Sequence, residues 1–278
     1  MRALPRPAFD SKSALDLCIG SVRDPDLKRR LGLAAETIEK AEATYLVKGD
    51  AACLFEIAGT KGVGGDVSTA EMETLYARTF VRSARTRHIY DTIKKLPEND
   101  ICPLCGQRTV YTLDHYLPQS DHPALTITSI NLVPACGECN HVKRAKQADK
   151  AEDQTLHPYF DHVDDARWLF ARVEERAPAA LYFYAAPPDH WLDVKRARVK
   201  RHFEMFGLGA LYASHSAVEL NNMRFGLRAL AAAGGPEVVS AHLMGCAESC
   251  AAAQANSWQR ATYDALAKSK WFYSGGFD

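Results

Sequence analysis

The chain has 278 residues, of which 47% are hydrophobic and 24% charged, and its 34 basic residues balance 34 acidic ones. This length and composition are typical of a globular protein with one large domain or two modest ones. No run approaches the roughly 18 apolar residues of a membrane span, and the first ten residues lack the apolar stretch of a signal peptide. We therefore expect a cytoplasmic protein without membrane contact. The zero net charge counts mildly against a nucleic-acid binder, although local basic faces still attract phosphates.

The N-terminal region, residues 1–98, predicts helices. Asp24-Pro25 is typical of a helix start, with an N-cap followed by proline at the first helical position. Apolar residues then recur at steps of three and four, which indicates one buried helix face. Ser68 and Glu71 have the spacing of a capping box that opens a second helix.

The C-terminal region, residues 151–278, also predicts mainly helix. Leu181–Tyr184 lies between prolines and indicates a short strand. Helices resume from about Leu192, and Ala229–Ala253 forms an alanine-rich stretch. Gly234-Gly235-Pro236 breaks that stretch, because glycine and proline both end helices. We expect two successive helices there.

Two C-x-x-C pairs dominate the central region, residues 99–150. Cys102 and Cys105 form the first pair, and Cys136 and Cys139 form the second. Two residues between thiolates let both sulfurs bind one ion, and four thiolates complete the closed tetrahedral shell of a structural Zn²⁺. Two redox motifs would instead need a thioredoxin-like βαβ context, which the sequence does not show. The cysteines expected outside the zinc site are Cys18, Cys53, Cys246 and Cys250.

Polar residues with catalytic chemistry lie between and after these pairs. They are Asp114-His115 after the first pair, Asn131 before the second, Asn140 directly after it, and Lys143. An imidazole titrates near neutral pH and can take a proton from water. Adjacent residues on a strand point to opposite faces, so Asp114 and His115 can serve different partners.

In this order, the residues from Cys102 to Lys146 resemble the HNH (ββα-metal) endonuclease family, in its bacterial standalone form with a four-cysteine zinc site. The resemblance implies an α+β, mostly α fold. A small ββα-metal, treble-clef-like core held by zinc is expected over residues 99–150, between helical N- and C-terminal regions. It also implies a metal-dependent hydrolase of phosphodiester bonds.

The resemblance assigns roles to individual residues. His115 is the expected general base, and Asp114 with Asn140 is expected to bind the catalytic ion, Mg²⁺ or Mn²⁺, through hard oxygen ligands. Asn131 is expected to fix the loop that orients His115. The basic residues expected at the phosphate backbone are Lys143, Arg144 and Lys146.

Neighbouring residues leave alternatives for these roles. The family often has histidine where Asn140 stands, so His141 is the reserve ligand. Asp121-His122 repeats the Asp-His pair farther from the cysteines, and we interpret it as loop sequence. His157 stands beside proline and aromatic residues, which favours packing.

The flanking regions carry two basic clusters. Arg78, Arg82 and Arg85 share one predicted helix face, and Lys195–Arg201 holds five basic residues. Such clusters hold a phosphate backbone without reading sequence. Duplex DNA is therefore the first expected substrate, and RNA stays open.

Three hypotheses for the function follow. The first is an HNH endonuclease, which lacks a P-loop of its own and by resemblance has an ATPase or regulatory partner in anti-phage defence. The second is a non-catalytic zinc-knuckle adaptor that binds nucleic acid or protein, and the third is a toxin-like nuclease held inactive by a partner. An adaptor does not need Asp114, His115 and Asn140 together, so their co-occurrence favours a nuclease. Cleavage specificity, oligomeric state, partner identity and activating signal are not encoded in these patterns.

Overall fold

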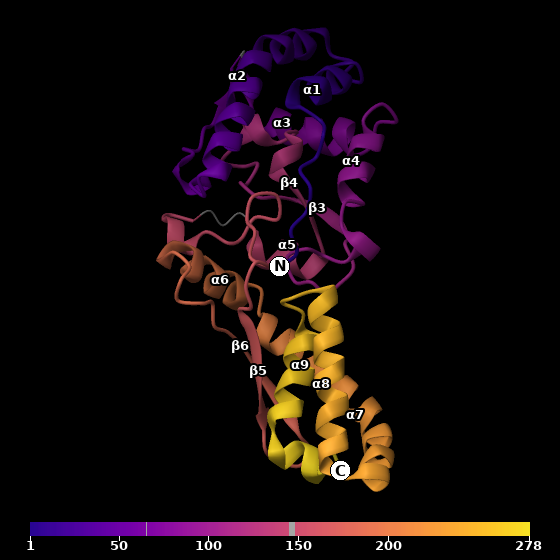
Figure 1. Ribbon diagram of the computed structural model, residues 1–278. Coiled ribbons are helices and arrows are strands. Elements are labelled where there is room, and N and C mark those ends of the chain that lie inside the picture. Colours follow the sequence, from indigo (N-terminus) through magenta and orange to yellow (C-terminus); the bar gives the residue numbers. More distant parts are fainter. Residues whose placement is uncertain (65, 145–147) are drawn as a thin grey trace. The chain divides into compact units, whose positions relative to one another are not determined.

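The computed structural model describes residues 1–64, 66–144 and 148–278, and divides the chain into two compact units, Met1–His162 and Val163–Asp278 (Figure 1). The fold is mixed α and β and mostly helical, as the sequence predicts. The first two predicted regions fall within one compact unit. Among the described residues, no helix has the length and apolarity needed to cross a bilayer.

The N-terminal unit begins with a set of helices. They are α1 (Ser11–Ile19), α2 (Pro25–Asp50), α3 (Thr69–Leu75) with the π-helical turn η2 (Tyr76–Phe80), and α4 (Arg87–Lys94). The Asp24 side chain accepts a hydrogen bond from the N–H of Asp26 at the start of α2. At the start of α3, Ser68 and Glu71 form both bonds of a capping box. Both predicted helix starts are confirmed.

Two short antiparallel hairpins lie among these helices. The first pairs β1 (Gly62–Val63) with β2 (Val67–Ser68). The second pairs β3 (Thr112–His115) with β4 (Leu132–Ala135) and is followed by α5 (Gly137–Lys143), which gives the order strand, strand, helix. One apolar core joins the hairpins to the helices. It includes Leu15, Leu31, Ile38, Met72, Phe80, Ile89, Ile93, Leu113 and Leu132.

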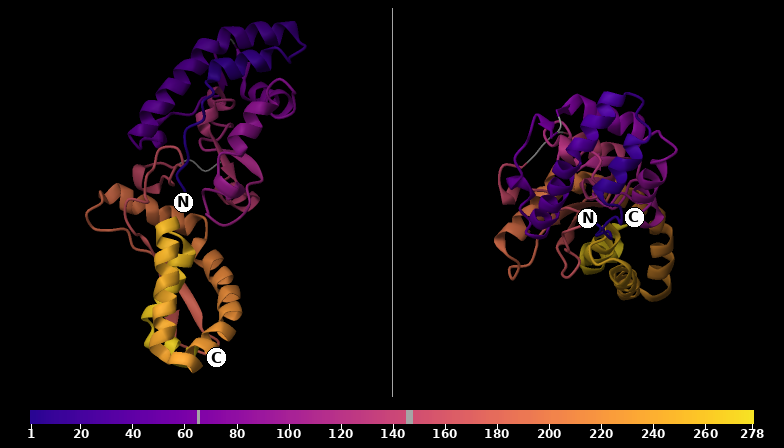
Figure 2. Two further views of the ribbon diagram at one scale, coloured as in Figure 1. Left: turned by 45° about the vertical axis from the view of Figure 1, so that its right-hand side comes forward. Right: turned by 90° about the horizontal axis from the view of Figure 1, so that it is seen from above.

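The C-terminal unit combines one hairpin with four helices. The hairpin pairs β5 (Leu169–Glu174) with β6 (Ala180–Ala185), and the helices are α6 (Asp193–Met205), α7 (Leu208–Gly234), α8 (Pro236–Ala253) and α9 (Trp258–Lys268). In the left view of Figure 2, the strands appear between α7 and the pair α8–α9. The strand predicted near Leu181 and the helix break at Gly234–Pro236 are confirmed, whereas β5 was not predicted.

Candidate functional site

The two cysteine pairs meet at one point in the N-terminal unit. The sulfurs of Cys102, Cys105, Cys136 and Cys139 all lie within 4.8 Å of one another, and all four residues are buried. Backbone N–H groups support the sulfurs: Arg108 donates to Cys105 Sγ, and Cys139 donates to Cys136 Sγ, both at 3.4 Å. Four thiolates in this arrangement are compatible with a tetrahedral zinc ion. The predicted four-cysteine metal-binding cluster is confirmed.

Local backbone geometry explains how each pair reaches the cluster. The first pair lies in a tight turn, closed by bonds from Gly106 N–H to the Cys102 carbonyl at 2.8 Å and from Cys102 N–H to the Arg108 carbonyl at 2.7 Å. Gly106 has φ +64°, which glycine adopts without strain. In the second pair, Cys136 is the N-cap of α5. A bound ion therefore connects the turn before β3 to the first turn of α5.

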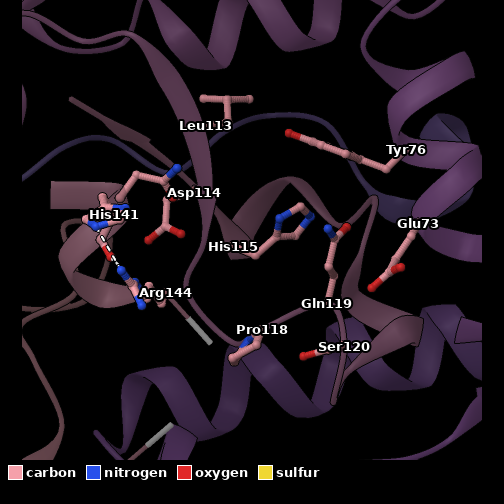
Figure 3. A pocket seen from close by; sticks show the side chains of 11 residues that line it. Glu73, Tyr76, Leu113, Asp114, His115, Pro118, Gln119, Ser120, His141 and Arg144 are labelled. Carbon is pink, nitrogen blue, oxygen red and sulfur yellow. Dashed lines mark hydrogen bonds between the residues drawn. The ribbon is translucent and has the colours of Figure 1, made fainter. Parts of the chain in front are cut away.

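A polar pocket of about 540 Å³ adjoins this module (Figure 3). Asp114 and His115 enter it from β3, and Asn140 enters it from α5. The other lining residues are Glu73, Tyr76, Leu113, Pro118, Gln119, Ser120, His141 and Arg144. The three principal residues expected from the sequence thus line the same pocket.

His115 is held in one orientation by its surroundings. Its Nε2 lies 2.8 Å from the carbonyl oxygen of Thr126. A carbonyl only accepts, so Nε2 carries the proton and Nδ1 is left with a lone pair. The Tyr76 ring packs edge-on against the imidazole, with centroids 4.6 Å apart. Burial lowers the pKa of His115 to about 4, so the ring is neutral at neutral pH.

Asp114 is a buried carboxylate with a buried cation beside it. Its Oδ2 forms an ion pair with Lys143 Nζ at 3.1 Å, and the two side chains are only 7% and 4% exposed. Burial raises the pKa of Asp114, and the ammonium of Lys143 opposes that rise. Lys143 Nζ also donates to the His115 carbonyl at 2.6 Å. A buried carboxylate needs such a counter-charge.

The position of Lys143 therefore differs from the expected one at a phosphate backbone. Among the other basic residues, Arg144 is exposed at the pocket, where its guanidinium lies 2.9 Å from Nε2 of His141. Lys146 lies outside the described residues. His141 lines the same pocket as Asn140, so the structure keeps both near the site.

Asn131 fixes the loop that follows β3. It is fully buried, and its Oδ1 accepts from the N–H of Leu117 at 2.8 Å. Its Nδ2 donates to the carbonyls of Leu117 at 3.0 Å and Leu125 at 3.2 Å. The same loop leads to Thr126, whose carbonyl holds His115. This geometry is what the predicted orienting role requires.

The pocket offers oxygen atoms of the kind that a hard divalent cation binds. Asp114 Oδ2 is buried and paired with Lys143, whereas Gln119 Oε1 is buried and accepts no hydrogen bond among the described residues. Asn140 adds an amide oxygen from α5. Within the described part of the chain, the cysteine cluster is the one group of three or more cysteine, histidine or acidic side chains close enough to share an ion. Mg²⁺ commonly takes one or two protein ligands and completes its shell with water and phosphate, so these oxygens suit it in chemical type, while Lys143 occupies the Asp114 carboxylate.

Sequence reasoning missed part of this pocket. Glu73 and Tyr76 come from α3 and η2, and Gln119 comes from the loop after β3. No motif or spacing marks these residues. Glu73 and Tyr76 reach the pocket only because α3 and η2 pack on the module.

The remaining candidate residues have structural positions. His157 is fully buried, and its Nε2 lies 3.0 Å from the Tyr45 hydroxyl, so it packs as expected. His122 is buried and does not line the pocket. In the second basic cluster, Lys195 pairs with Asp165, Arg196 pairs with Asp189, and Arg198 is 2% exposed. That cluster is not a free basic face.

Comparison with known proteins gives one distant relative. Protein ea31 of Escherichia phage lambda is 24% identical over 233 residues, which cover 80% of this chain and 79% of ea31. The aligned length far exceeds the cysteine module, so the similarity extends into the helical regions. No family model matches the sequence, and no solved structure gives a significant match. What is shown is thus a mostly helical protein with a four-cysteine metal-binding cluster.

Proposed function

We propose that this chain is a metal-dependent endonuclease of the HNH type, which hydrolyses phosphodiester bonds in nucleic acid, with DNA as the first substrate to test. One observation carries the proposal: Asp114 and His115 at the end of β3 and Asn140 in the following helix line one pocket, next to the cysteine cluster. The order strand, strand, helix agrees with the ββα-metal core that the sequence resemblance implies.

His115 is the proposed general base. With Nε2 bonded to the Thr126 carbonyl, Nδ1 is the nitrogen able to take a proton from an attacking water. A nearby phosphate stabilises the imidazolium and raises the pKa of His115 toward the operating pH. Asn131 keeps this geometry by tying the loop between Leu117 and Leu125.

Asp114 and Asn140 would hold a divalent cation, Mg²⁺ or Mn²⁺. When bound, such an ion supplies Lewis acidity at the phosphate and stabilises the leaving oxygen. Arg144 is exposed at the pocket and placed to neutralise a phosphate. The zinc site has a structural role, because its closed shell leaves no position for a water.

One observation favours the adaptor alternative. The ion pair with Lys143 already neutralises Asp114, which lowers the affinity of that carboxylate for a cation. An adaptor would use the zinc-held scaffold to bind nucleic acid or protein and would keep this pair closed. In the endonuclease, Lys143 must shift for the cation to bind.

The test is cleavage of plasmid DNA and total RNA by wild type and His115→Ala, with Mg²⁺, with Mn²⁺ and with EDTA. We expect metal-dependent cleavage by wild type and a loss of roughly 10²–10⁴-fold in the variant, the usual contribution of a general base. His190→Ala changes an exposed histidine of the C-terminal unit and is the matched control. Cleavage that is independent of metal, or equal in His115→Ala, contradicts the proposal.

The same proposal includes two biological settings. In the first, the nuclease acts in the cytoplasm in anti-phage defence with a regulatory or ATPase partner. In the second, it is toxin-like and a partner holds it inactive. Each predicts that wild type, when inert alone, gains activity or toxicity in cells, and that His115→Ala abolishes it. Recovery of the chain from native cells, with and without phage, identifies such a partner. If wild type and His115→Ala behave identically both in vitro and in cells, the adaptor is the correct reading.

A further inference from the structure

A second cavity of the N-terminal unit lies on the other side of α3 from the candidate site. Its volume is about 740 Å³, within the range of pockets that take small organic ligands. We call it the α2–α3 cavity. Ser21, Arg23 and Leu27 line it from the α1–α2 turn and α2, and Thr74, Leu75 and Arg78 line it from α3 and η2.

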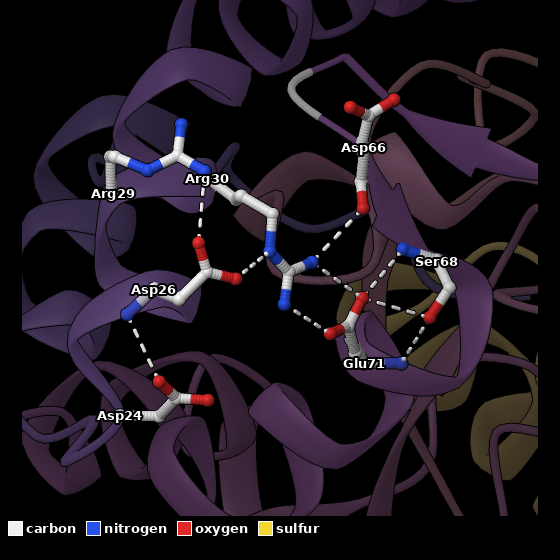
Figure 4. A network of polar contacts seen from close by, with 7 residues as sticks. All are labelled: Asp24, Asp26, Arg29, Arg30, Asp66, Ser68 and Glu71. Atoms are coloured by element: carbon white, nitrogen blue, oxygen red, sulfur yellow. Dashed lines mark hydrogen bonds and ion pairs between the residues drawn. The ribbon is translucent and has the colours of Figure 1, made fainter.

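The acidic groups at this cavity are already engaged. Glu71 binds the guanidinium of Arg30 through two bonds, at 2.7 and 3.0 Å, and also accepts from the N–H of Ser68 (Figure 4). Arg30 is shared with Asp26, which lies 2.7 Å away. The Asp24 carboxylate caps α2 by accepting from Asp26 N–H. Asp26 and Glu71 are thus paired with a cation, whereas Asp24 keeps its negative charge at the helix N-terminus.

The cations at the cavity are not engaged in the same way. Arg23 and Arg78 are exposed, and neither forms an ion pair within the described residues. Two unpaired guanidinium groups outnumber the one lining carboxylate without a cationic partner, that of Asp24, and this balance favours an anionic ligand. Guanidinium binds carboxylate, sulfonate and phosphate groups through paired N–H donors.

The other lining residues determine what kind of molecule could carry this anionic group. Val22, Leu27 and Leu75 supply apolar surface. The hydroxyls of Ser21 and Ser83 bond each other at 2.8 Å. Ser21 Oγ also lies 3.5 Å from the Leu17 carbonyl, and Ser83 Oγ accepts from the N–H of Arg85 at 3.3 Å, so this pair offers mainly acceptor sites to a ligand. The lining therefore fits an apolar body with one anionic group.

The same helix connects this cavity to the candidate site. Thr74 and Arg78, four residues apart, face the α2–α3 cavity, whereas Glu73 and Tyr76 line the pocket of His115. Tyr76 stacks on Phe80 within η2, with centroids 5.5 Å apart, and its edge packs on His115. A π-helical turn often marks a functional position in a helix. A ligand that shifts α3 or η2 therefore moves Tyr76 against His115.

We propose that the α2–α3 cavity is an effector site for a small organic anion with an apolar body, and that its occupation is transmitted through η2 and Tyr76 to His115. Binding at the cavity does not depend on the proposed nuclease activity. The regulatory consequence rests on it, because His115 is the proposed base.

The test compares two fluorescent probes with one ring system: anilinonaphthalene sulfonate, which is anionic, and phenylnaphthylamine, which is neutral. We expect wild type to bind the sulfonate more tightly. Arg23→Met and Arg78→Met should each weaken sulfonate binding about tenfold, the loss of one charge-assisted bond, and leave phenylnaphthylamine binding within about twofold. Arg82→Met is the control, because Arg82 is exposed on the same segment but does not line the cavity.

The proposed anion site is wrong if wild type does not bind the sulfonate. It is also wrong if Arg23→Met, Arg78→Met and Arg82→Met all bind the sulfonate equally well. Transmission is measured separately, as a change in the His115 ring resonance in NMR spectra at saturating sulfonate, assigned with His115→Ala. If the sulfonate binds as expected but the His115 resonance does not change, the binding site stands and the effector role is wrong. Neither measurement uses nuclease activity, so failure here and failure of the proposed endonuclease are distinguishable.

Discussion

The candidate-site module and the C-terminal unit are stabilised by different means. The module consists of two four-residue strands and a seven-residue helix around four cysteines. The C-terminal unit has helices of 27 and 18 residues and fully buries large side chains such as Trp168 and Phe272. A module this short has little apolar area of its own, although Leu113 and Leu132 join the core of the N-terminal unit. The metal ligands add stabilisation that the C-terminal unit obtains from packing of its long helices.

The largest expected effect comes from loss of the metal. Cys105→Ser removes one of four ligands, and we expect it to abolish zinc binding and disorder the site, because structural zinc contributes about 10 kcal/mol or more in small zinc modules. Zinc content and hydrogen exchange of both units measure this. The C-terminal unit should keep its protection, and Cys246→Ser, outside the cluster, should leave the zinc in place. Equal loss of hydrogen-exchange protection in both units would show that the C-terminal unit also depends on the metal.

The second-largest expected loss of stability comes from replacing either of two buried asparagines, one in each unit. Asn131 ties the loop after β3, and Asn256 accepts from Trp168 N–H at 2.8 Å and donates to the Ala166 carbonyl at 2.9 Å. Replacement of either by alanine leaves buried backbone groups unpaired, at about 1–3 kcal/mol for each group. We expect Asn131→Ala to destabilise the N-terminal unit and Asn256→Ala the C-terminal unit.

Urea unfolding followed by hydrogen exchange assigns each loss to its unit. The proposed nuclease activity adds a second distinction, since Asn131→Ala alone should reduce that activity beyond the loss of folded protein. If Asn256→Ala is fully folded but loses activity, the candidate site also depends on the C-terminal unit, and the two units are not independent.

The smallest effect concerns the ion pair between Arg30 and Glu71. The side-chain bond with Arg30 lowers the pKa of Glu71 from 4.5 to about 2. A carboxyl with a lowered pKa stabilises the folded state fully above its unfolded pKa, and this contribution is lost as the pH falls from about 4.5 toward 2. The difference in unfolding temperature between wild type and Arg30→Met should therefore narrow below about pH 4.5. Zinc release in acid affects both proteins and therefore cancels in the difference between their unfolding temperatures. If that difference widens in acid, the ion pair with Arg30 is not what lowers the pKa of Glu71.

Local signals accounted for much of the fold. The N-cap at Asp24, the capping box of Ser68 with Glu71, and the break at Gly234–Pro236 each depend on a few adjacent residues, and all three were predicted. The strand β5 was missed, because Leu169–Glu174 mixes apolar and charged residues without clear alternation. Its pairing with β6 supplies the stabilisation that its own sequence does not indicate.

The sequence by itself determined the metal cluster and the set of residues around it, because C-x-x-C spacing and short motifs act over a few residues of backbone. Only the tertiary structure decided what surrounds them. It placed Lys143 against Asp114 instead of at the surface, and it brought Glu73 and Tyr76 to His115 from a helix far away in the chain. Such contacts follow from the burial of charge and the packing of helices, which depend on the whole core and which no local pattern encodes.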